Sequence, residues 1–97
     1  SILSVNREPE NQKQDLLIPN PATNDILIKT NLPYNDFLIV NMQDLTGKTI
    51  EQIYNKFASK GIFELNYNIS HLNIGSYFIT ILQSDFIKTF KMIREGK

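Results

Sequence analysis

Apolar and polar residues alternate with a period of two along most of the chain from Asp15 onward. The clearest case is Gly61–Ile69, where Phe63, Leu65, Tyr67 and Ile69 alternate with Ile62, Glu64, Asn66 and Asn68. This alternation is typical of a half-buried β-strand. The segments that show it are Leu16–Ile18, Asp25–Thr30, Phe37–Gln43, Lys48–Tyr54, Gly61–Ile69, Ser76–Gln83 and Phe86–Ile93.

About seven strands with turn residues between them predict an all-β fold, an immunoglobulin-like antiparallel β-sandwich. We expect two sets of residues to face the core: Leu38, Val40 and Met42, and Tyr77, Ile79 and Ile81. In two other strands the alternation places residues on one shared face: Ile26 with Ile28, and Phe86 with Lys88, Phe90 and Met92.

The segment Lys48–Tyr54 gives the weakest strand signal, because Glu51 and Gln52 interrupt its apolar pattern. We expect a strand with Ile50 facing inward. The spacing of the apolar residues over Ile50–Phe57 also fits a helix, although Gly47 and Gly61 leave it little room.

Two connections carry strong turn chemistry. Pro19 and Pro21 fix φ and remove two ladder donors, so sheet pairing is interrupted around Asn20. Such a kink suits a chain that crosses from one sheet of a sandwich to the other. Asp44–Gly47 predicts a hairpin turn, in which Gly47 takes a positive φ and Asp44 bonds its own backbone.

The chain of 97 residues fits a single domain, with 41% aliphatic and aromatic residues. The first fourteen residues (1–14) are mostly polar and predict a linker or cleavage region before a domain at 15–97. Ser1–Val5 is too short to read as a signal peptide, and no apolar run approaches the roughly 20 residues that span a bilayer.

The residue content offers little for catalysis. The chain has no Cys and a single His, His71, whose neighbour Ser70 points the other way on extended backbone. We therefore expect no enzyme, no catalytic residues, no metal and no cofactor; a weak cation site among the oxygens of Asn20–Asp25 stays open. Ten basic and ten acidic residues cancel, which disfavours nucleic-acid binding.

Four segments in order along the chain carry a family resemblance. They are Ile18-Pro-Asn-Pro-Ala-Thr-Asn-Asp-Ile-Leu-Ile28, Asp44-Leu-Thr-Gly-Lys48, Leu72-Asn-Ile-Gly-Ser-Tyr77 and Lys88-Thr-Phe-Lys-Met-Ile93. The chain resembles the C-terminal sorting domain (type A) of cargo that Bacteroidetes export by type IX secretion. Asn24, Asn73 and Ser76 depart from the family pattern. The motif residues that match are Pro19, Asn20, Pro21, Asp44, Gly47, Lys48 and Leu72.

The resemblance implies a secretion signal that the outer-membrane translocon recognises to export a fused N-terminal cargo domain. A surface sortase usually then cleaves upstream, so the domain passes through the periplasm and reaches the cell surface or the medium. We expect the final hairpin to be read by the translocon. The expected recognition residues are Gly75, Tyr77, Lys88, Phe90, Lys91, Met92 and Ile93.

Two other functions stay open at this point. One is an immunoglobulin-like adhesion or carbohydrate-binding accessory module, for which Tyr34, Phe37, Tyr54, Phe57 and Phe78 are candidate exposed aromatics. The other is an uncleaved domain that docks on a component of the export machinery.

Overall fold

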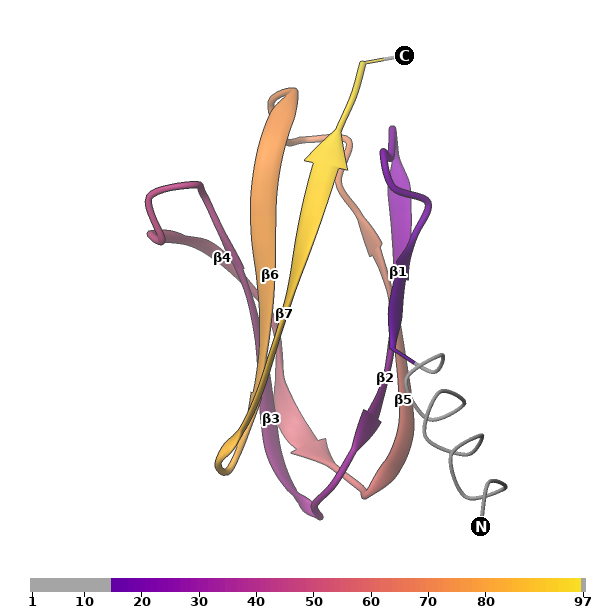
Figure 1. Ribbon diagram of the computed structural model, residues 1–97, viewed down its shortest axis with the longest axis vertical. Helices are drawn as coiled ribbons and strands as arrows, with labels where there is room; N and C mark the ends of the chain where they lie inside the picture. Colours follow the sequence, from indigo (N-terminus) through magenta and orange to yellow (C-terminus); the bar gives the residue numbers. More distant parts are fainter. Residues whose placement is uncertain (1–14, 97) are drawn as a thin grey trace, which may run out of the picture.

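The computed structural model describes residues 15–96, and these form two antiparallel sheets packed face to face (Figure 1). One sheet has three strands in the order β1-β2-β5, and the other has four in the order β4-β3-β6-β7. The strands are β1 (Leu16–Ile18), β2 (Asp25–Leu32), β3 (Asp36–Gln43), β4 (Thr49–Ala58), β5 (Gly61–Asn68), β6 (Gly75–Gln83) and β7 (Phe86–Arg94). The all-β sandwich predicted from the alternation is confirmed; its immunoglobulin-like detail stays a prediction.

The core is made by alternate residues of the inner faces, as the period of two requires. Both sheets contribute fully buried aliphatic side chains to it. The most buried apolar residues are Ile26, Ile28 and Leu32 of β2, Leu38, Val40 and Met42 of β3, Ile79 and Ile81 of β6, and Met92 of β7. Each predicted core residue in β3 and β6 is therefore confirmed, and Ile26 and Ile28 share the inner face of β2.

The segment that could be read as a strand or a helix forms strand β4. This strand is longer than predicted and contains no helix. Its pairing with β3 shifts register between Val40 and Asn41 and again between Met42 and Gln43. The second shift leaves Ile50 without a partner opposite it, and its side chain is 38% exposed. The expectation that Ile50 faces inward was wrong, because a bulge breaks the alternation that the prediction relied on.

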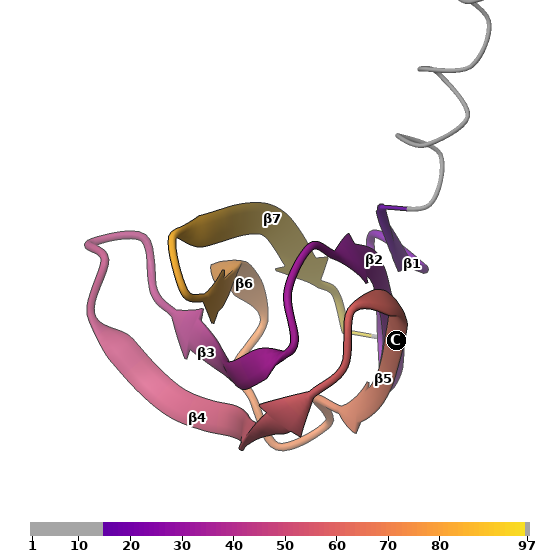
Figure 2. The same cartoon turned by 90° about the horizontal axis from the view of Figure 1, so that it is seen from below.

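A buried glutamine closes one end of the sandwich. Gln83, at the end of β6, donates from Nε2 to the carbonyl oxygens of Tyr34 (2.8 Å), Ala58 (3.2 Å) and Asp36 (3.3 Å), and its Oε1 accepts from the amide of Tyr34 (3.2 Å). These bonds satisfy the polar groups of a side chain that is 1% exposed. Seen from this end, the strands encircle the core and β4 curves toward β5 (Figure 2).

The connection after β1 contacts the other sheet but returns to its own. β1 pairs with β2 in the three-stranded sheet, whereas Ala22 forms a parallel bridge with Arg94 at the end of β7 in the other sheet. Because β1 and β2, on either side of Pro19 and Pro21, are neighbours in the three-stranded sheet, the expectation that the chain crosses to the other sheet here was wrong. The prediction of a linker over residues 1–14 lies outside the described residues. No helix among the described residues is long and apolar enough to cross a membrane.

Candidate functional site

The segment that follows β1 is bonded to the last strand of the chain. Asn20 donates from Nδ2 to the carbonyl oxygen of Lys91 (2.8 Å), and its Oδ1 accepts from the amide of Ile93 (3.0 Å). Ala22 continues the pairing: its amide donates to Ile93 O and its carbonyl accepts from the amide of Glu95, both at 2.8 Å. We call these four bonds the β7 clasp.

The two prolines explain why a side chain takes part in the clasp. Pro19 and Pro21 have no N–H, so the backbone on either side of Asn20 cannot donate to a neighbouring strand. The amide side chain of Asn20 supplies one donor and one acceptor in their place. Both Ile18–Pro19 and Asn20–Pro21 are cis peptides. The Pro19-Asn20-Pro21 motif thus forms a local structure that is hydrogen-bonded to β7 through the Asn20 side chain.

Arg94 adds a second attachment at the same end of the sandwich. Its Nε donates to the carbonyl oxygen of Ile69 (2.9 Å) and its Nη2 to that of Ser70 (3.3 Å), in the connection between β5 and β6. The amide of Ile69 in turn donates to Asn24 O at 2.6 Å. Segments that are far apart in the sequence therefore converge on the end of β7, at the top of Figure 1.

The motif that leads into β6 lies beside this point. Leu72 is half-buried and packs on the core, and Gly75 begins β6 with φ 153°, a value that favours glycine. Tyr77 is buried, and its hydroxyl donates to the carbonyl oxygen of Asn73 at 2.6 Å. This motif therefore fixes the start of the strand that pairs with β7.

The Asp44 motif is a separate structural turn between β3 and β4. Asp44 Oδ1 accepts from the amides of Thr46 (2.9 Å) and Lys48 (3.1 Å) and from the Thr46 hydroxyl (2.5 Å). Gly47 has φ 91°. The Thr46 hydroxyl, together with the two amides and the Lys48 charge, lowers the pKa of Asp44. The predicted turn is confirmed, with Lys48 exposed at its end.

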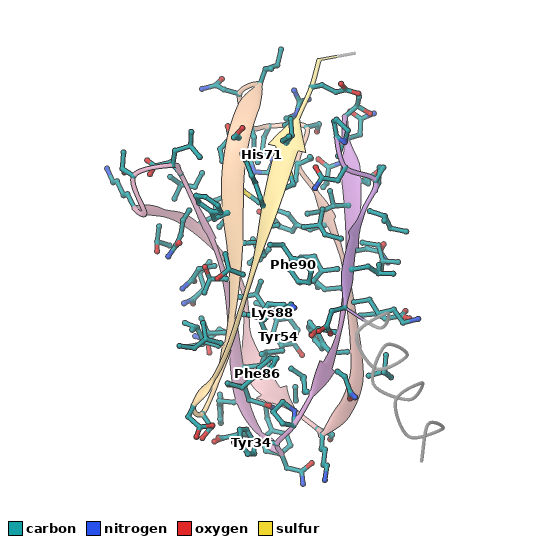
Figure 3. The ribbon with its side chains drawn as sticks, in the orientation of Figure 1. Tyr34, Tyr54, His71, Phe86, Lys88 and Phe90 are labelled. Carbon is teal, nitrogen blue, oxygen red and sulfur yellow. The ribbon has the colours of Figure 1, made fainter. Side chains whose placement is uncertain are left out.

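The expected recognition residues fall into two groups. Met92 and Tyr77 are buried, Phe90 is half-buried, and Lys88 lies on the inner side with its Nζ 3.4 Å from Asp15 Oδ2 and 5.7 Å from the Phe90 ring centre. Figure 3 shows Phe86, Lys88 and Phe90 lying between the sheets. Lys91 and Ile93, in contrast, are exposed on the outer side of β7. Lys91 and Ile93 are therefore the two of these residues that are exposed on the outer side, whereas Gly75 is half-buried and the Lys88 side chain is 37% exposed beside Asp15.

Several residues that hold β7 were not singled out from the sequence. They are Ala22, Arg94 and Asp15, the last of which also accepts from the Thr30 hydroxyl at 2.7 Å. Arg94 could be noticed only as one of several basic residues near the end of the chain. Its carbonyl partners lie 24 and 25 positions away, and no local pattern marks such a contact.

The lone imidazole belongs to a structural cluster. His71 Nε2 lies 2.5 Å from Glu51 Oε2, and the Tyr67 hydroxyl donates to the other carboxylate oxygen. Burial, followed by the bond to Glu51, raises the pKa of Tyr67 to about 12. Ser70 is bonded elsewhere, to Asn68 Oδ1 at 2.6 Å. Ser70 and His71 are therefore not paired as nucleophile and base.

The oxygens considered for a cation serve as hydrogen-bond partners. Asn20 bonds β7, and Asp25 Oδ1 accepts from Asn68 Nδ2 at 3.0 Å. Residues 15–96 contain no group of three or more His, Cys, Asp or Glu side chains placed to hold a metal ion. No cation site is assigned on this loop.

Among the candidate aromatics, Phe37 and Phe57 are exposed side by side. Their ring centres are 6.3 Å apart with an interplanar angle of 86°, an edge-to-face arrangement. Tyr54 instead faces the core, where it meets Phe63. The Phe37 and Phe57 rings are perpendicular, so this pair does not form one flat aromatic surface along which several sugar rings would stack. This arrangement does not favour the carbohydrate-binding alternative.

Comparison with known proteins agrees with the motifs. The family model described as the secretion system C-terminal sorting domain matches residues 16–95. No curated protein matches the chain significantly. The family match spans all seven strands and the β7 clasp.

Proposed function

The chain belongs to the family of secretion system C-terminal sorting domains, which are type IX secretion signals, and on that premise we propose that the outer-membrane translocon recognises it. The recognition carries a fused N-terminal cargo domain across the outer membrane. The family match over residues 16–95 is the observation that carries this proposal. The convergence of three of the four matching segments on the end of β7 supports it; the fourth, around Asp44, is a separate turn.

The outer side of β7 is the part that the translocon contacts. The side chains of Lys91 and Ile93 are exposed there, and the Asn20 side chain bonds the backbone of both residues. The remaining expected residues act by holding the strand: Tyr77, Phe90 and Met92 pack inward, and Lys88 is paired with Asp15. A partner thus meets a strand whose position is fixed before contact, which lowers the ordering cost of binding.

The sorting domain acts once, during export. The precursor reaches the periplasm, folds there and is taken through the translocon to the surface. A sortase then cleaves upstream of the strands, within or before residues 1–14, and the cargo is released or joined to an anionic lipopolysaccharide.

A reporter protein with a Sec signal and residues 1–97 at its C-terminus tests this function in a type IX-competent host. The reporter is expected at the cell surface or in the medium in the competent strain, and in the periplasm of a strain that lacks the translocon. Deleting 90–97 is expected to leave the reporter in the periplasm as well. Periplasmic retention of the intact fusion in the competent strain, or delivery that does not require the translocon, would contradict the proposal.

A further inference from the structure

The outer face of the four-stranded sheet differs in chemistry from the rest of the surface. Residues opposite one another in antiparallel strands share a face, so the register identifies the outward side chains. They are Thr49, Gln52, Asn55 and Phe57 of β4; Phe37, Ile39, Asn41 and Gln43 of β3; Ser76, Phe78, Thr80 and Leu82 of β6; and Ile87, Thr89, Lys91 and Ile93 of β7. Among these outward residues of the four described strands, Lys91 alone carries a charge.

Five of these side chains form a continuous apolar strip across all four strands. Phe57 lies opposite Phe37, Ile39 lies opposite Leu82, and Leu82 lies opposite Ile87. We call Phe37, Ile39, Phe57, Leu82 and Ile87 the apolar strip.

The strip is open to solvent over much of its area. The exposed fractions of Phe37, Phe57 and Ile87 are 60%, 53% and 65%. At 150–250 Å² for a whole aromatic side chain, the exposed parts amount to roughly 300 Å². The largest apolar patch on a typical monomeric protein covers about 300–600 Å² and is often functional, and the strip reaches that range.

The outer face of the three-stranded sheet provides an internal comparison. It also carries exposed apolar side chains, such as Ile18 (49%) and Ile62 (50%). There, however, charged residues interrupt them: Lys29 and Glu64 lie opposite one another and form an ion pair at 3.6 Å. The absence of such charges around the strip is therefore a property of one face.

Resting on the function proposed above, we propose that the apolar strip and Lys91 form one docking surface for an outer-membrane protein of the translocon. The partner's surface is apolar where it meets the strip and carries a carboxylate where it meets Lys91. Lys91 lies four positions after Ile87 along β7, so the two contacts lie about 14 Å apart. Such a span falls within a single protein–protein interface.

The charge on this face distinguishes the partner from a second copy of the chain. In a symmetric pair the same face meets itself, and each Lys91 would face strands whose outward residues include no carboxylate. Like charges brought together without counter-charges oppose association. A different protein that supplies a carboxylate satisfies Lys91 and still covers the apolar strip.

Site-specific photocrosslinking in the type IX-competent host tests the surface directly. Benzoylphenylalanine is placed at position 57 or 87 of the reporter fusion, and at position 62 on the opposite sheet as a control. The expected result is an adduct with an outer-membrane translocon protein from positions 57 and 87 alone, weakened several-fold by Lys91→Glu. Adducts with a second copy, with a protein unrelated to export, or equally from position 62 would overturn the proposal, as would no adduct at all.

An export assay with matched variants separates this inference from the proposed function. The double variant Phe57→Ser/Ile87→Ser removes two exposed side chains of the strip, and Ile18→Ser/Ile62→Ser removes two of similar exposure from the other sheet. About a tenfold loss of export is expected for the first pair only, with both purified chains melting close to the wild type. If the wild type is exported and both pairs are exported equally well, the docking surface is wrong and the sorting function stands. If the wild type is not exported, the sorting function itself fails.

Discussion

Asn20 Oδ1 accepts a hydrogen bond from the amide of Ile93 at 3.0 Å, across 73 positions of sequence. The same side chain donates to Lys91 O, so one amide group is hydrogen-bonded to the last strand on both sides of Met92. The clasp places the beginning and the end of the matched family region side by side. It explains why a proline-flanked asparagine near the start of the domain matters for a strand at its end.

The clasp predicts a local effect of Asn20→Ala. Loss of two hydrogen bonds is expected to lower the free energy of unfolding by about 1–2 kcal/mol. It also frees the amide of Ile93, whose hydrogen exchange should accelerate by more than the change in global stability explains. Urea denaturation and amide exchange measure the two effects.

Asn66→Ala provides the control for that measurement. Asn66 is exposed on the outer face of β5, opposite Leu27, and its truncation is expected to change stability by less than about 0.5 kcal/mol. Unchanged exchange at Ile93 in Asn20→Ala would show that the clasp does not hold β7.

Gln83→Leu is expected to be among the more damaging substitutions. Leucine fits an apolar setting, but it leaves the Tyr34 and Ala58 carbonyls and the Tyr34 amide without the partner that Gln83 supplies. The expected loss is about 2–4 kcal/mol, measured by urea denaturation. Gln52→Leu, at an exposed position on β4, is the matched control and should cost little. Equal stability of the two variants would contradict the closing role of Gln83.

The Asp44 turn predicts acid sensitivity with a defined direction. Its pKa is lowered from the ordinary 3.8 in the folded state by the Thr46 hydroxyl and the backbone amides, so the folded chain favours the carboxylate. The resulting stability is present above 3.8 and is lost as pH falls through the lowered folded value. The melting temperature of the wild type should therefore exceed that of Asp44→Ala at neutral pH. The difference between the two melting temperatures should become smaller as the solution is made acidic. A difference in melting temperature that does not change with pH would contradict the stabilising role of the Asp44 carboxylate.

Tyr67 predicts the opposite dependence, in alkali. Burial and the bond to Glu51 raise its pKa from 10.0 to about 12, so the folded state keeps a proton that the unfolded chain releases first. Stability is expected to fall as pH rises between these values, and Tyr67→Phe should remove that part of the fall. The absorbance of tyrosinate measures the titration of Tyr67. The difference between the titration curves of the wild type and Tyr67→Phe should have its midpoint near pH 12. A difference centred at the ordinary value would contradict the buried contact.

The alternation of side chains was sufficient to predict the strands and most of the core. It works for Leu38, Val40 and Met42 because each inner residue is followed by one that can face solvent. It failed at Ile50, where a bulge shifts the face without any local signal. It also placed Lys88 on the same face of its strand as Phe90 and Met92, but it could not show that this face is the inner one or that Asp15 lies there to pair with Lys88.

The candidate site was only partly predictable, for a physical reason. The motifs around Asn20, Asp44 and Gly75 are local, since prolines, glycines and short polar side chains act on their own backbone. The contacts that make them a site are not local. Arg94 with Ile69 and Asn20 with Lys91 exist only because the topology brings distant segments together.

Export of the fused reporter with Lys91→Glu/Ile93→Ser tests the central claim most directly, because both side chains face outward and neither packs in the core. Lys60→Glu/Ile62→Ser is the matched control, with the same changes at exposed positions beside and within β5. The account predicts that the wild type and the control reach the cell surface or the medium, while the β7 variant folds but stays in the periplasm. Delivery of the folded β7 variant at the wild-type level would contradict it.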